Sequence, residues 1–150
     1  MRTPRSCWPF LADKARKAVN AIQAEIAASR LRLEQLQANR ERLTGLYEEY
    51  HARETSLQVG SLGMQAHMNQ RQFMAQLLGL LQRVDTDIAQ ARAGLAQQQA
   101  RRVQAEIELQ KMQALQAQDQ AAVRQEQQAR EQRQMDELGV MQFNLRRMQG

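Results

Sequence analysis

Residues 19–50 read VNAIQAEIAASRLRLEQLQANRERLTGLYEEY, and one position in them recurs in alternating steps of three and four residues. Eight of its ten occurrences carry a large apolar side chain. They are Val19, Ile22, Ile26, Ser29, Leu33, Leu36, Arg40, Leu43, Tyr47 and Tyr50. This spacing forms the apolar seam of a coiled coil, because it keeps one side of an α-helix facing a partner helix. The stretch therefore predicts a long helix that needs a second helix beside it.

A second seam with the same spacing follows after a short break, and nine of its eleven positions are apolar. They are Leu77, Leu81, Val84, Ile88, Ala91, Leu95, Gln98, Arg102, Ala105, Leu109 and Met112. Serines and glycines cluster between the two seams, in residues 55–63, where they favour a turn. We predict, in chain order, a loose lead-in over residues 1–9, a helix over residues 10–54, a turn over residues 55–66 and a second helix over residues 67–148.

The two seams match residue by residue when the helices run antiparallel. Opposite positions then have residue numbers with a constant sum, and a sum of about 124 sets nearly every seam residue against another. The pairs include Tyr50 with Met74, Tyr47 with Leu77, Leu43 with Leu81, Leu36 with Ile88, Leu33 with Ala91, Val19 with Ala105 and Ala15 with Leu109. We predict an all-α fold, a single antiparallel two-helix coiled-coil hairpin over residues 1–150 with a longer second helix.

The second helix is expected to extend beyond its partner, because the pairing ends near Leu11 and Met112. Between residues 113 and 134 the only sizeable apolar residues are Leu115 and Val123. An apolar stripe then returns, formed by Met135, Leu138, Met141, Leu145 and Met148. A stripe with no partner in its own chain is a candidate docking helix. Self-association and folding back of this end remain alternatives.

Composition narrows the classes of partner and compartment. The net charge is +5, but the arginines are spread along the chain among glutamates, which favours a solvated helix face over nucleic-acid binding. Cys7 is the only cysteine, so no internal disulfide is possible and a reducing compartment is expected. No signal-peptide core or membrane span is evident, and we predict a cytoplasmic protein.

The sequence carries no recognisable catalytic or cofactor motif. It has neither a phosphate-binding glycine-rich loop with lysine nor a dinucleotide fingerprint. His51 and His67 have no cysteine or carboxylate at ligand spacing, and Asp85 and Asp87 are interpreted as solvated carboxylates. A two-helix rod offers no cavity in which to desolvate an acid and base pair. We predict no cofactor, no metal and no enzymatic activity.

Three short segments resemble a known family. They are LYEEY at residues 46–50, NQRQF at residues 69–73 and EQRQMDE at residues 131–137, with Leu77 and Leu80 after the second. In this order along two long helices, they resemble the FliJ proteins of the bacterial flagellar export apparatus, which are related to the YscO-type stalk proteins of virulence type III secretion.

The resemblance implies a coiled-coil stalk similar to the gamma subunit of rotary ATPases, monomeric when isolated. It implies binding to the hexameric export ATPase, which such stalks stimulate, to the membrane export gate and to export chaperones, and hence a position peripheral to the inner membrane. The export-gate contact would map to Asn39, Leu43, Leu46, Tyr50, Phe73, Leu77, Leu80 and Val84. The ATPase-facing segment would comprise Arg133, Met135, Asp136, Glu137, Leu138, Met141 and Leu145. A virulence secretion stalk and a homo-oligomeric structural coiled coil are the alternatives.

Overall fold

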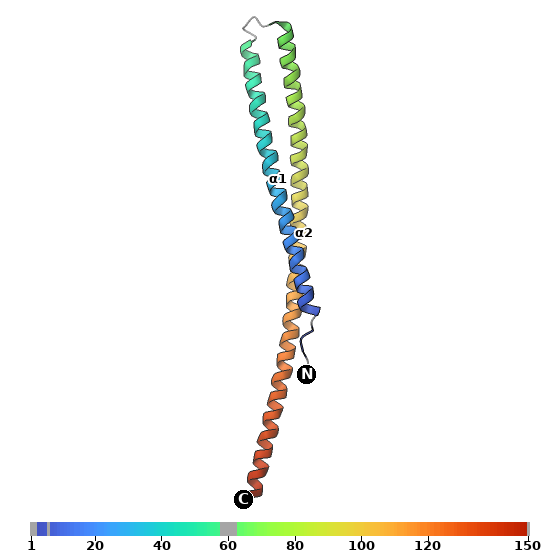
Figure 1. The fold of residues 1–150 in the computed structure, drawn as a ribbon, viewed down its shortest axis with the longest axis vertical. Helices are drawn as coiled ribbons and strands as arrows, with labels where there is room; N and C mark the ends of the chain where they lie inside the picture. Colours follow the sequence, from blue (N-terminus) through green and yellow to red (C-terminus); the bar gives the residue numbers. More distant parts are fainter. Residues whose placement is uncertain (1–2, 6, 58–62, 150) are drawn as a thin grey trace. The chain divides into compact units, whose positions relative to one another are not determined.

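Two α-helices make up the computed structural model, which describes residues 3–5, 7–57 and 63–149 (Figure 1). Helix α1 is Cys7–Leu57 and helix α2 is Met64–Gln149, with 51 and 86 residues respectively. The described residues contain no strand. The predicted all-α hairpin with a longer second helix is confirmed.

Both helices are somewhat longer than predicted. Helix α1 begins three residues early and includes Pro9, which is tolerated because the first-turn amides have no partner inside the helix. Helix α2 begins at Met64, and the His67 amide donates to the Gly63 carbonyl at 3.3 Å. Of the predicted turn, residues 58–62 lie outside the described residues, as do residues 1, 2 and 6 of the lead-in.

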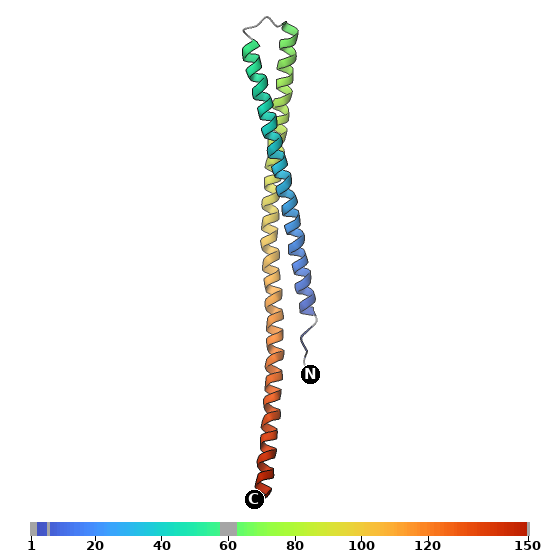
Figure 2. The same cartoon turned by 60° about the vertical axis from the view of Figure 1, so that its left-hand side comes forward.

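The chain divides into two compact units, which are described separately. The first, called here the link-side unit, is Ala21–Arg102. Within it α1 and α2 lie side by side and run in opposite directions in both Figure 1 and Figure 2. Its core is the predicted seam, where Ile22, Ile26, Met74, Leu77, Val84 and Ile88 are buried.

Polar contacts between the helices agree with the predicted register of the link-side unit. Arg40 is expected opposite Val84, and its Nε donates to Oδ1 of the adjacent Asp85. Arg101 and Glu25 are joined at 3.3 Å, and Arg71 lies 3.4 Å from Glu54. Each of these pairs falls within two residues of the predicted alignment.

Gln98 is one of four polar positions in the two seams. The Oε1 atom of Gln98 is buried and has no hydrogen-bond partner in the part of the chain that the structure describes. A buried unpaired acceptor costs about 1–3 kcal/mol relative to a satisfied one. This stretch of the seam is therefore weaker than the stretch around Leu77 and Ile88.

The second unit, the terminal unit, combines Met1–Asn20 with Val103–Gly150. Ala12 and Val19 of α1 and Val123 of α2 are buried, while Ala105, Leu109, Met112 and Leu115 are half-buried. The covered part of α2 thus reaches Val123, whereas the sequence places the end of pairing near Met112. The lead-in also contacts α2 beyond Met112, where the Arg5 amide donates to Asp119 Oδ2 at 2.7 Å. From residue 131 to residue 149 every side chain is exposed.

The register predicts a specific cross-link. In a chain carrying Cys7→Ser, cysteines placed at Leu36 and Ile88 are expected to form a disulfide within one chain, because these positions oppose each other across the seam. Mass spectrometry after mild oxidation detects it. Pairing Leu31→Cys with Ile88→Cys is the control, since Leu31 is exposed. Cross-links that form only between chains would contradict the hairpin.

Two adjacent leucines on α2, Leu77 and Leu78, allow the effect of seam packing to be distinguished from the effect of a surface substitution. Leu77 is 3% exposed and Leu78 is 44% exposed. We expect Leu77→Ala to lower the free energy of unfolding by about 2 kcal/mol or more, through lost burial and an unfilled cavity. Leu78→Ala should change it by no more than about 0.5 kcal/mol. Urea denaturation followed by circular dichroism measures both, and equal losses would contradict the assigned seam.

Candidate functional site

The residues expected to contact the export gate all lie in the link-side unit, and they differ in how far a partner can reach them. Leu77 and Val84 are buried, so they hold the helix pair together. Leu43, Leu46 and Tyr50 are half-buried, whereas Asn39, Phe73 and Leu80 are exposed. We call the three exposed residues together with Leu46 the turn-proximal surface. The remaining four act mainly through packing.

Aromatic packing joins the helices near the turn. The rings of Tyr50 and Phe73 lie 4.7 Å apart between centroids at an interplanar angle of 52°, a favourable tilted geometry. Gln70 Nε2 donates to the Tyr50 carbonyl at 3.0 Å, and the Arg53 guanidinium carbon lies 5.4 Å from the centre of the Tyr50 ring. Phe73 still exposes 37% of its surface. The cluster therefore fixes Phe73 while leaving one side of it accessible.

Three exposed apolar residues close to the turn in the link-side unit were not among the predicted site residues. They are Met64, Met68 and Leu78. Their sequence signal is that each lies off the apolar seam, on a helix whose seam is already filled. They enlarge the apolar surface next to the turn.

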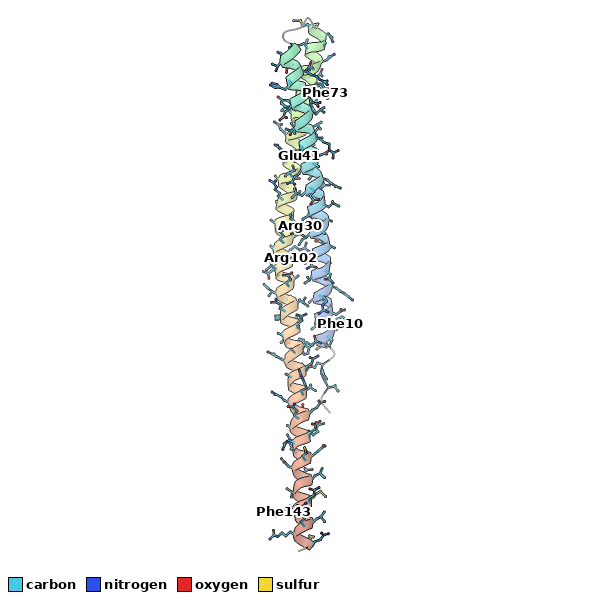
Figure 3. All side chains as sticks on the ribbon, turned by 90° about the vertical axis from the view of Figure 1, so that its left-hand side faces the viewer. Phe10, Arg30, Glu41, Phe73, Arg102 and Phe143 are labelled. Atoms are coloured by element: carbon cyan, nitrogen blue, oxygen red, sulfur yellow. The ribbon has the colours of Figure 1, made fainter. Side chains whose placement is uncertain are left out.

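The predicted ATPase-facing residues lie in the terminal unit, on the part of α2 from residue 131 to residue 149, called here the C-terminal segment. All seven of them are exposed. Figure 3 shows side chains standing around this segment of helix, with Phe143 labelled near its end. No other described part of the chain covers it.

Val140 and Phe143 do not belong to the apolar stripe predicted from the sequence, and both are exposed. At 3.6 residues per turn they lie on the side of α2 opposite Leu138, Met141 and Leu145. The C-terminal segment is thus apolar on two opposite sides rather than along one stripe. A helix of this kind is typical of a position enclosed by other protein.

The charges of the C-terminal segment balance. It holds Glu131, Asp136 and Glu137 against Arg133, Arg146 and Arg147. The two last arginines lie in the final turn of α2, where they complement the helix dipole. Apolar contact, rather than net charge, is therefore the attraction this segment offers.

Hollows along the helices are shallow and open to solvent. One of about 240 Å³ in the link-side unit is lined by Ser29, Arg32, Asp87, Gln90, Ala91 and Gly94. Such a groove does not exclude water, so it offers no site to desolvate an acid and base pair. Among the described residues no group of three or more histidine, cysteine or carboxylate side chains is placed to hold a metal ion. In the same residues neither helix contains a stretch long and apolar enough to cross a membrane.

Comparison with known proteins identifies one family. The family model described as flagellar FliJ protein matches residues 10–148. No curated protein and no solved structure matches the chain. The family match spans almost all of α1 and α2 and leaves the lead-in outside. The chain therefore belongs to the FliJ family, whose members are components of the flagellar export apparatus.

Proposed function

We propose that this chain is a non-enzymatic cytoplasmic stalk that binds and stimulates the hexameric flagellar export ATPase, links it to the export gate and escorts export chaperones. The observation that carries the proposal is the C-terminal segment, which is exposed and apolar on two opposite sides. Each large apolar side chain that becomes buried contributes about 1.5–3 kcal/mol to binding.

A ring fits this segment better than a groove does. A groove covers one face of a helix, which would leave either Phe143 or Leu145 in water. The central opening of a hexamer surrounds a helix and covers both faces. The balanced charge of the segment is consistent with contact through packing.

The other roles rest on two surfaces. Phe73 and Leu80 of the turn-proximal surface supply exposed apolar area for the gate, and both are held by a well-packed seam beneath them. Chaperone escort is supported by Met135, Met141 and Met148, because flexible thioether side chains adapt to more than one partner.

If a ring encloses the C-terminal segment, both of its apolar faces must contribute to binding. We expect Leu138→Gln with Leu145→Gln, and separately Val140→Gln with Phe143→Gln, each to weaken binding to purified flagellar ATPase by about tenfold or more. Glutamine keeps the helix while removing apolar contact. Affinity and ATP hydrolysis are measured together, with a chain ending at Gln134 as the reference for complete loss.

Loss of binding from only one of the two pairs would indicate a groove instead of a ring. Full stimulation by the shortened chain would contradict the assignment of this segment. The competing occupant is a second copy of the chain, and light scattering tests it: a stable dimer, rather than a monomer of 17.3 kDa, would favour a homo-oligomeric structural coiled coil.

The gate assignment is tested on an exposed residue, so that folding is not confounded with contact. Leu80 is 43% exposed, and Leu80→Gln is expected to reduce binding to the cytoplasmic domain of the gate protein by about tenfold. The free energy of unfolding should change by no more than about 0.5 kcal/mol. Leu31→Gln, at an exposed leucine of the same unit away from the turn, is the matched control and should bind normally.

A further inference from the structure

The lead-in makes a specific contact with α2. The Arg5 amide donates to the Asp119 carboxylate at 2.7 Å, a short distance typical of a hydrogen bond to a charged acceptor. The Trp8 amide in turn donates to the Arg5 carbonyl at 3.4 Å, which joins this contact to the first turn of α1. Trp8 itself is half-buried.

Val123 shows how closely this part of α2 is covered. It is 4% exposed, whereas Val140 on the same helix is 59% exposed. A helix does not bury its own outward valine, so another part of the chain must lie over Val123. Asp119 lies one turn before Val123 on the same face of α2, so the segment that bonds Asp119 is within reach of Val123 as well.

We infer that residues 3–5 and 7–8 form an intramolecular clasp whose docking site on α2 consists of Asp119 and Val123. The charge-assisted hydrogen bond from the Arg5 amide to Asp119 fixes the clasp, and Val123 supplies the apolar contact. While the clasp is closed, this turn of α2 is closed to other molecules. Beyond this turn, α2 is open to partners along the C-terminal segment, where every side chain is exposed.

The clasp is a feature of this chain outside the region that defines its family, because the family match begins at residue 10. It does not rest on the proposed partners. An ATPase that failed to bind would leave the clasp intact, and an open clasp would leave the proposed function untouched.

Thiol labelling tests the clasp in the full-length chain. In a Cys7→Ser background, Val123→Cys and Val140→Cys are compared for their rate of reaction with iodoacetamide. We expect Val123→Cys to react at least about tenfold more slowly than Val140→Cys, because its reaction requires the cover over Val123 to open locally. Adding Asp119→Ala should raise its rate by about tenfold, the effect of losing a hydrogen bond to a charged group.

Matched controls separate the clasp from unwinding of the helix. Asp136 lies four residues before Val140, as Asp119 lies four before Val123, and it accepts a hydrogen bond from Gln132 of its own helix at 3.3 Å. Asp136→Ala should leave the labelling of Val123→Cys unchanged. Alanine is the strongest helix former, so neither substitution opens α2 through propensity.

Three outcomes would overturn the inference. Equal labelling rates at the two positions would show that Val123 is not covered in solution. If Asp119→Ala left the labelling rate of Val123→Cys unchanged, the hydrogen bond to Asp119 would not be what holds the clasp closed. Protection of Val123→Cys that increases with protein concentration would assign the cover to a second copy of the chain.

Discussion

Everything in this structure depends on burial of one apolar seam between two helices. Long helices without tertiary contacts are marginal in water, and this composition, with few aromatic residues, offers no other core. The residues that stabilise the fold are therefore a single file along each helix, such as Ile26 and Leu77. Many other positions on the helix surfaces, such as Leu80, contribute little to the fold and are available for binding.

That separation explains why the candidate gate residues are not equivalent. Leu77 and Val84 belong to the seam, and replacing them changes stability before it changes any contact. Phe73 is intermediate, because its packing on Tyr50 fixes it while part of the ring remains exposed. Leu80 lies outside the seam. A loss of activity after substitution carries information about a partner only at positions of the last kind.

The sequence was sufficient for the helices, their direction and their register, because the seam is periodic and the fold has a single core. The clasp was not predictable from it. The Arg5 amide belongs to the backbone, and the Asp119 carboxylate lies 114 residues away on a helix that shows no periodic signal there. The two-sided character of the C-terminal segment was missed for a related reason: a search for one stripe passes over Val140 and Phe143. Contacts outside the repeat require coordinates.

The ion pairs between the helices have a consequence for register. Exposed pairs such as Arg40 with Asp85 contribute little to stability, about 0–1 kcal/mol each. A seam of interchangeable aliphatic residues, however, permits the helices to slip by one heptad. Such a slip in one direction would set Arg40 against Arg92 and Glu25 against Glu108, and in the other it would set these residues against Leu78 and Gly94. The apolar residues alone would give these alternative alignments nearly equal stability. The weak ion pairs form only in the observed alignment, so they disfavour the misaligned hairpins.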